Sequence, residues 1–411
     1  MRFKLTKAVI TAAAVVGLVT SIGVPVTTAS ATPTLAPIKI ALITSLTGVA
    51  SSQYQGGPDG LLARIALQNA QGGVNGHKIV PIVIDDQSSL TQVVTATQQA
   101  MADGAIGIVA VTAFFFAAYK YPQKAGIPVT GAATDGPEWG LQPNTNMFPT
   151  DGLAFPHPTP VYAALGKFFK SKGGSFIASY GYGISPTSSD SAKSAAKSSQ
   201  IAGLKVGVLD TSIPFGGVNF TSQALTAKTN HVNALYAGLD NDSNFALMTA
   251  LKQGGVKLKV TEFPTGYEPD IINTPAWQDV QGAYFESYFR PTAIPNAGTI
   301  QMANAMLKYQ HRSLKDFPTL DMYESWAGAD LLIKGLQLAG KNPTAAGVIS
   351  ALRTVKAYTA NGLLPVPTNY SLANFGKAPL VTCGWFMQAQ TSGFVANSTQ
   401  PTCGKIIPGE T

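Results

Sequence analysis

The chain has 411 residues, of which 45% are hydrophobic and 12% are charged, and its 28 basic and 21 acidic residues leave a net charge of +7. This excess is small and no dense run of basic residues accompanies it, so the composition argues against a nucleic-acid-binding protein. The length exceeds what one hydrophobic core usually holds, at ~100 to 200 residues per domain, and two domains are expected.

The first residues have the design of an export signal. A basic start at 1–7 precedes an uncharged apolar run at 8–24, and the small residues Ala-Ser-Ala follow at 29–31. A permanent membrane anchor is the alternative, but the run contains glycine and polar residues and is short for a span of ~20 residues. We predict a signal peptide at 1–31, cleaved before Thr32, and no lipid anchor, because no cysteine follows the apolar run. Removing its three basic residues lowers the net charge from +7 to +4.

From residue 38 the hydrophobic pattern alternates between strands and helices. The predicted strands are 38–44, 79–85, 107–112 and 127–130, and the predicted helices between them are 57–71, 90–103 and 114–125. This order predicts a parallel sheet with helices on both faces. Ligands of such sheets lie beyond the carboxyl ends of the strands.

A passage rich in proline and glycine at 137–160 is expected to cross to a second domain, where the alternation restarts. Strands are predicted after this passage at 175–179, 204–209, 232–237, 282–289 and 380–388, and helices at 190–201 and 245–253. The further helices predicted at 300–309, 323–338 and 344–353 are assigned to the first domain. The Ser/Lys/Ala-rich run at 185–200 could also be a flexible linker, but its lysine spacing favours a solvated helix face. Ser243 is the predicted N-cap of the helix at 245–253.

Five short segments in the first half carry a family resemblance when taken together and in order. They are 38–48, the turn Asn-Ala-Gln-Gly-Gly-Val-Asn-Gly-His-Lys-Ile at 69–79, Asp-Asp-Gln-Ser at 85–88, Ala-Gly-Ile-Pro-Val at 125–129 and Gly-Ala-Ala-Thr at 131–134. The chain resembles the branched-chain amino-acid (Leu/Ile/Val-type) periplasmic binding proteins of ABC importers, more loosely to about residue 390.

The resemblance implies an α/β fold with two Rossmann-like lobes, which have parallel-sheet cores and are joined by a three-crossing hinge, the type I periplasmic-binding fold. It predicts lobe 1 at 36–152 plus 287–366 and lobe 2 at 153–286 plus 367–405. The third crossing is expected near 363–370, and a hinge of this kind allows the lobes to close on a ligand.

The resemblance also suggests ligand-binding residues in the first lobe. Thr112, Ala132 and Thr134 align with the points that receive a ligand carboxylate, where backbone N–H groups and a helix N-terminus favour an anion. Tyr54 matches an aromatic pocket wall, and Phe114 could line the cleft. The alternatives are a helix N-cap for Thr112, a loop-stabilising role for Thr134, a surface position for Tyr54 and core packing for Phe114.

The partner for a ligand ammonium group is less well defined, because the chain departs from the family pattern in the second lobe. The stretch with Tyr267 and Glu268 is displaced from the expected position of the family's glutamate. Asp240 at a strand end is another carboxylate, and Asp321 beside Tyr323 is a third, with a helix cap as the alternative for Asp321. A buried charge needs a partner, so an amino-acid ligand would require one of them.

No constellation for catalysis, metal binding or a cofactor is present in the sequence. Asp85 and Asp86 are adjacent on a strand and point to opposite faces, so they do not converge on one substrate. The histidines are far apart, and no nucleophile elbow or phosphate loop occurs. We therefore predict no enzyme activity, no metal site and no cofactor.

Cys383 and Cys403 are the only cysteines of the chain. An even pair in an exported protein is most simply a disulfide, here closing a C-terminal loop.

The function predicted from these observations is an extracytoplasmic solute-binding protein of an ABC importer, exported to the periplasm or cell envelope. Its partners would be a small polar or carboxylate-bearing solute, such as an amino acid, and a membrane permease complex, with no nucleic acid. The alternatives are an aromatic acid or an amide or urea-like ligand on the same fold, a sensory ligand-binding protein, and a secreted α/β enzyme.

Overall fold

Two β-sheets organise the chain in the computed structural model, which describes residues 35–410 apart from 134–135, 152–158 and 313–317. The first sheet is parallel and has the strand order β2-β1-β3-β4-β5. Its strands are β1 (Ile38–Thr44), β2 (Ile79–Asp85), β3 (Ile108–Val111), β4 (Val129–Gly131) and β5 (Met147–Pro149). The predicted signal peptide, 1–31, lies outside the described residues.

Helices cover both faces of the first sheet, which explains why its strands are mostly apolar on both faces. Along β1, Ile40 and Leu42 point to one hydrophobic core and Ala41 and Ile43 to another. The first core includes residues of α2 (Gly57–Ala70), α10 (Ala297–Gln310), α11 (Leu320–Leu338) and α12 (Ala345–Leu352). The second includes α3 (Leu90–Ala102) and the segment before α4 (Lys120–Ala125), and the short α1 (Ser51–Tyr54) follows β1.

The second sheet has the order β12-β11-β10-β9-β8-β6-β7, and β13 pairs with β11. Its strands β6 to β10 run parallel, and β11 is antiparallel to β10. The strands are β6 (Phe176–Tyr182), β7 (Lys205–Ile213), β8 (Ala234–Gly238), β9 (Val260–Phe263), β10 (Tyr284–Ser287), β11 (Val381–Gln390), β12 (Gly393–Ala396) and β13 (Thr402–Lys405).

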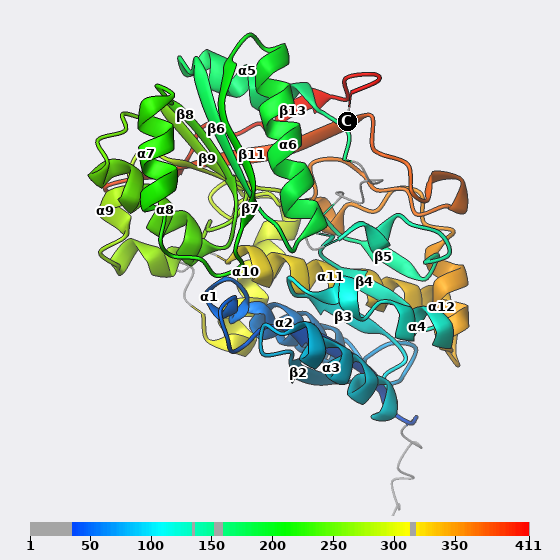
Figure 1. Ribbon diagram of the computed structural model, residues 1–411. Coiled ribbons are helices and arrows are strands. Elements are labelled where there is room, and N and C mark those ends of the chain that lie inside the picture. Colours follow the sequence, from blue (N-terminus) through cyan, green and yellow to red (C-terminus); the bar gives the residue numbers. More distant parts are fainter. Residues whose placement is uncertain (1–34, 134–135, 152–158, 313–317, 411) are drawn as a thin grey trace, which may run out of the picture. The chain divides into compact units, whose positions relative to one another are not determined.

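One face of the second sheet packs against α5 (Ala163–Ser171) and α6 (Pro186–Ile201). The other packs against α7 (Thr221–Thr229), α8 (Asn241–Gln253) and α9 (Trp277–Val280), as Figure 1 shows. Short 3-10 helices are η1 (Phe115–Ala117), η2 (Pro137–Trp139), η3 (Pro269–Asn273), η4 (Ala360–Gly362) and η5 (Leu372–Asn374).

The predicted fold class, two α/β lobes with parallel-sheet cores, is confirmed. The chain passes from β5 to α5, from β10 to α10, and from η4 to β11, so three connections join the parts built around the two sheets. The lobe boundaries given above remain a prediction. Strand β5 lies inside the passage predicted as a crossing. The elements that were not predicted are β9, β12, β13, α1, α5, α7 and α9.

Two local predictions were wrong. The helix expected over 114–125 is divided into η1 and α4, because Pro122 lacks an N–H and is tolerated only in the first turn of a helix. The N-cap of α8 is Asp240, which accepts a hydrogen bond from the Ser243 backbone N–H, so Ser243 lies inside the helix.

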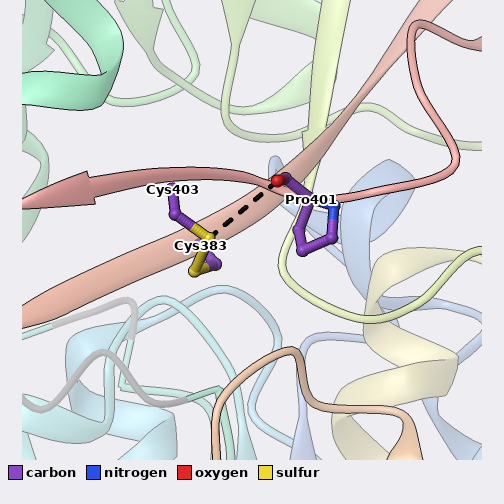
Figure 2. The surroundings of a disulfide bond; sticks show 3 residues. All are labelled: Cys383, Pro401 and Cys403. Atoms are coloured by element: carbon purple, nitrogen blue, oxygen red, sulfur yellow. Dashed lines mark hydrogen bonds between the residues drawn. A yellow bond between two sulfur atoms is a disulfide. The ribbon is translucent and has the colours of Figure 1, made fainter.

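The predicted disulfide between Cys383 and Cys403 is present and joins β11 to β13, where the two residues are directly opposite each other. Figure 2 shows the bond between the two strands, with the Pro401 carbonyl oxygen 3.9 Å from the Cys403 sulfur. A sulfur in a disulfide carries no hydrogen, so this contact adds no hydrogen bond. The covalent link therefore holds β13 on an otherwise short pairing.

Within the described residues, none of the helices combines the length and the apolar character needed to cross a bilayer.

Replacing both cysteines by serine should lower the free energy of unfolding by ~3 kcal/mol, because the cross-link restricts the unfolded chain over 20 residues. Chemical denaturation of the wild type and the double variant measures the difference. A reducing agent should reproduce the loss in the wild type and leave the double variant unchanged. An unchanged wild-type transition under reduction would contradict the prediction.

Candidate functional site

A buried carboxylate ties together the carboxyl ends of three neighbouring strands of the first sheet. Asp86, directly after β2, accepts a hydrogen bond from Ser45 Oγ at 2.7 Å after β1 and another from Thr112 Oγ1 after β3. All three side chains are buried, and burial raises the pKa of Asp86 although the hydroxyl donors oppose the shift. The hydroxyl of Thr112, predicted to receive a ligand carboxylate, is thus hydrogen-bonded to a carboxylate of the chain itself.

Aromatic rings fill the space beside this edge. Phe215, from the loop after β7, lies with its ring centroid 4.9 Å from Phe114 and 4.7 Å from Tyr182 at the end of β6. The Tyr182 hydroxyl donates to Asp240, which also accepts from the Ser243 N–H at 2.8 Å. Asp240 therefore caps a helix and has partners within the lobe, and Phe114 packs in a core.

The remaining predicted site residues are also placed inside the protein. Asp321 accepts hydrogen bonds from Thr319 Oγ1 and from the Met322 N–H at 2.9 Å, and burial raises its pKa to about 6. The Tyr323 ring stacks on Phe289 with a centroid distance of 5.5 Å. Tyr54, Ala132, Tyr267 and Glu268 are buried, and Thr134 lies outside the described residues.

A cavity of about 820 Å³ lies between the two sheets, with walls from both. Ala133, Trp139 and Pro149 line it from the side of the first sheet. From the second sheet and α6 it is lined by Ser188, Ser191, Ala195, Tyr236, Gly238, Thr265, Glu286, Tyr288 and Phe386. The connection 364–384 closes a further side. The volume falls in the range of ~300 to 1,000 Å³ that is typical of small-molecule sites.

None of the described residues among the predicted ligand contacts lines this cavity. Their assignment as ligand contacts stays a prediction. The cavity is lined at the ends of other strands than those of Asp86 and Thr112, by Ala133 after β4, Pro149 at the end of β5, Gly238 at the end of β8 and Thr265 after β9.

The cavity wall contains ionisable groups that the sequence did not single out. Glu286 on β10 lines the cavity, and Glu262 on β9 is fully buried with no hydrogen-bond partner for either carboxyl oxygen. Burial raises the pKa of Glu286 to about 7, and burial and the charge of Glu286 raise that of Glu262. The sequence did contain a pattern that could have identified Glu286. In the segment 284–289 the polar-tipped residues Tyr284, Glu286 and Tyr288 occupy every second position and so share one face of the strand.

Two basic residues of the described chain, Arg353 and Lys377, line the cavity. For Arg353 the structure shows a set of hydrogen bonds to the fold. Its guanidinium donates to the carbonyl oxygens of Thr145 at 2.9 Å, Met147 at 3.0 Å and Tyr370 at 3.0 Å. Burial lowers the pKa of Arg353 to about 10. These bonds anchor α12 to the strand β5 and commit most of the donors of the guanidinium to the fold.

Replacing Thr112 by valine should lower the free energy of unfolding by ~1 to 3 kcal/mol, because the buried Asp86 loses a hydrogen-bond donor. Denaturant unfolding measures the loss. In a variant that already carries Asp86→Ala, the same replacement should lower the free energy of unfolding much less, because the Thr112 hydroxyl no longer has a carboxylate to which it can donate a hydrogen bond. Equal losses in the two backgrounds would contradict the role assigned to Thr112.

The stability of the protein should fall as the pH rises from about 4.5 to about 7. Between these pH values Glu286 is ionised in the unfolded chain but still protonated in the folded protein. The raised pKa of Glu286 therefore contributes stability that is fully present below its ordinary pKa of 4.5 and is lost as the pH rises through about 7. Glu262, Tyr236 and Tyr288 face the same group and do not supply a cation. Melting temperatures across this range measure the effect.

The variant Glu286→Gln should show a weaker dependence on pH over that range, because it removes one titrating group. Asp242→Asn, at an exposed position on α8, makes the same carboxyl-to-amide change and should keep the wild-type dependence. Parallel curves for wild type and Glu286→Gln would show that Glu286 does not titrate in this range.

The architecture around the cavity is shared with known binding proteins. The family model described as periplasmic binding protein matches residues 37–394. No sequence among the curated proteins is significantly similar to the chain.

Solved structures with the same fold have low sequence identity. A solute-binding protein of an ABC transporter from R. palustris, in complex with benzoate, is 15% identical with a TM-score of 0.71, covering 91% of this chain and 98% of that one. A leucine-binding protein from Thermotoga maritima is 15% identical with a TM-score of 0.72, covering 88% and 98%. A fatty acid ABC transporter substrate-binding protein from Thermomonospora curvata is 17% identical with a TM-score of 0.72, covering 89% and 92%.

At these identities the solved structures establish the fold alone, and the three proteins differ in what their names say they bind. The family match, in contrast, spans most of the chain and coincides with both sheets and the cavity between them. The chain therefore belongs to the periplasmic binding protein family, whose members of this fold include solute-binding proteins of ABC transporters.

Proposed function

We propose that the protein is an extracytoplasmic solute-binding protein that captures a small solute in the cavity between its two sheets and delivers it to an ABC permease in the membrane. The observation that carries the proposal is the cavity itself, whose walls come from both sheets and from the connection 364–384. A solute in contact with both lobes stabilises their closed arrangement, and the permease would recognise that arrangement. Export by the predicted signal peptide places the protein on the side of the membrane where importers collect solutes.

The lining of the cavity favours a solute with an apolar body and few polar groups. Trp139, Tyr162, Leu165 and Phe386 provide apolar and aromatic surface, and Glu286 is an ionisable group among them. The predicted carboxylate-bearing solute, such as an amino acid, is compatible with this wall when its carboxylate lies away from Glu286, where Arg353 and Lys377 line the cavity. The leucine, benzoate and fatty acid in the names of the similar structures share an apolar body, which supports this solute class.

A bulky side chain on the cavity face of α6 should abolish solute binding without unfolding the protein. Ser191 lines the cavity and is partly exposed, so Ser191→Phe would place a ring in the binding space. A thermal-shift panel of amino acids, aromatic acids, fatty acids, amines and amides identifies the stabilising class in the wild type, and calorimetry then measures the loss in the variant.

The matched control is Gln200→Phe, an exposed position on the same helix that does not line the cavity. It should bind as the wild type does. Small-angle scattering with the saturating solute should show compaction of the wild type. Full binding in Ser191→Phe would place the solute outside the cavity, and the absence of binding by every class in the panel would refute the proposed function.

A further inference from the structure

Two glutamates and three tyrosines share the face of the second sheet that looks toward α6. Tyr236 on β8 and Tyr284 on β10 are the register partners of Glu262 on β9, between them. Glu286 and Tyr288 follow Tyr284 at every second residue, so they point to the same face. Tyr236, Glu286 and Tyr288 line the cavity, which places Glu262 immediately behind its wall.

The two carboxyl groups have no partner in the described chain. Glu262 is fully buried and neither of its oxygens is hydrogen-bonded. Neither glutamate takes part in an ion pair with a described lysine or arginine. A buried carboxyl group without a hydrogen bond costs stability, and such groups in native proteins call for an explanation.

The neighbouring strand leaves room for Glu286 to face the cavity. Gly384 on β11 lies against its carboxyl group, and a Cβ at this position would collide with Oε1 of Glu286. Gly384 also lines the cavity, next to the disulfide-bonded Cys383. The wall is thus shaped around the carboxyl group by a residue without a side chain.

We propose that Glu286, backed by Glu262 and flanked by the rings of Tyr236 and Tyr288, binds the ammonium group of an amine-bearing solute. An ammonium group supplies the positive charge and the donors that the two carboxyl groups lack, and tyrosine rings attract a cation further. The apolar wall formed by Leu165 and Phe386 takes the hydrocarbon part of the solute. This inference rests on the proposed function and specifies the solute class for the same cavity.

The subsite differs from the ammonium partners predicted from the sequence. Asp240 and Asp321 are already hydrogen-bonded to Tyr182 and Thr319, respectively. The raised pKa of Glu286, about 7, has a consequence for such a subsite: the carboxyl group must lose its proton to pair with the cation. Affinity for an amine is therefore expected to weaken as the pH falls below about 7.

Pairs of probes with the same apolar body test the proposal. Butylamine and 2-phenylethylamine are compared by calorimetry with butanol and 2-phenylethanol, and phenylacetate and calcium chloride are added as separate arms. The amines should bind the wild-type protein about tenfold or more tightly than the alcohols, as a charge-assisted hydrogen bond requires. Glu286→Gln, which keeps the shape and removes the charge, should erase this preference, and Glu262→Gln should reduce it.

The variants have a folding control and a binding control. The melting temperature at low pH, where the wild-type carboxyl is protonated, should be similar in Glu286→Gln and the wild type, and Asp242→Asn should leave amine binding unchanged. The proposal would be overturned if the alcohols bound as tightly as the amines, or if Glu286→Gln bound the amines as tightly as the wild type does. It would also be overturned if calcium, and not the amines, bound in a way that depends on Glu286, or if neither amine bound at millimolar concentration.

The outcome separates this inference from the proposed function. Phenylacetate or another solute that binds the wild type, is blocked by Ser191→Phe and is unaffected by Glu286→Gln would leave the solute-binding function in place and refute the ammonium subsite. No binding by any class of solute would refute both.

Discussion

The hydrogen bonds that Asp86 accepts from Ser45 and Thr112 occupy the polar groups at the carboxyl edge of the first sheet that would otherwise be available to a ligand. Three parallel strands end at this edge, and their backbone and helix N-termini favour an anion there. In this chain the group at that position is the buried side-chain carboxylate of Asp86, which belongs to the protein itself. The edge is consequently a structural joint between β1, β2 and β3, and the cavity lies beside the ends of β4 and β5 and against the second sheet.

The five acids Asp86, Asp240, Asp321, Glu262 and Glu286 divide into two kinds. Asp86, Asp240 and Asp321 each accept hydrogen bonds from hydroxyl or backbone groups close to strand ends or helix starts, which offset the cost of their burial. Neither oxygen of Glu262 is hydrogen-bonded, and Glu286 lines the cavity without a hydrogen-bond partner among the described residues. Carboxyl groups of the first kind stabilise the fold, whereas those of the second kind cost stability and are expected where a ligand can supply what is missing.

Much of the fold could be predicted from the sequence, because the strands of both sheets are short apolar runs separated by helix-period segments. The site could be predicted less well, since its hydrogen bonds join residues far apart. Thr112 was correctly placed at a strand end. The sequence does not show, however, that its hydroxyl donates a hydrogen bond to Asp86, which follows the strand β2. Asp85 and Asp86 do point apart: Asp85 accepts from the Leu46 N–H at 2.8 Å, and Asp86 turns to Ser45.

The unpaired glutamates couple solute binding to stability. Ionisation of Glu286 in the folded protein is opposed by burial, so the stability that the protonated carboxyl group contributes is lost as the pH rises through about 7. A cationic solute removes that penalty, and its binding adds to stability with the logarithm of its concentration over the dissociation constant. The wall that holds Glu286 also includes Gly384 and Cys383, and the connection 364–384 that leads to them joins the two sheets. A solute that pairs with Glu286 would therefore contact a wall to which the connection between the two sheets also contributes, and charge pairing at this side chain would favour whichever arrangement of the lobes brings both walls onto the solute.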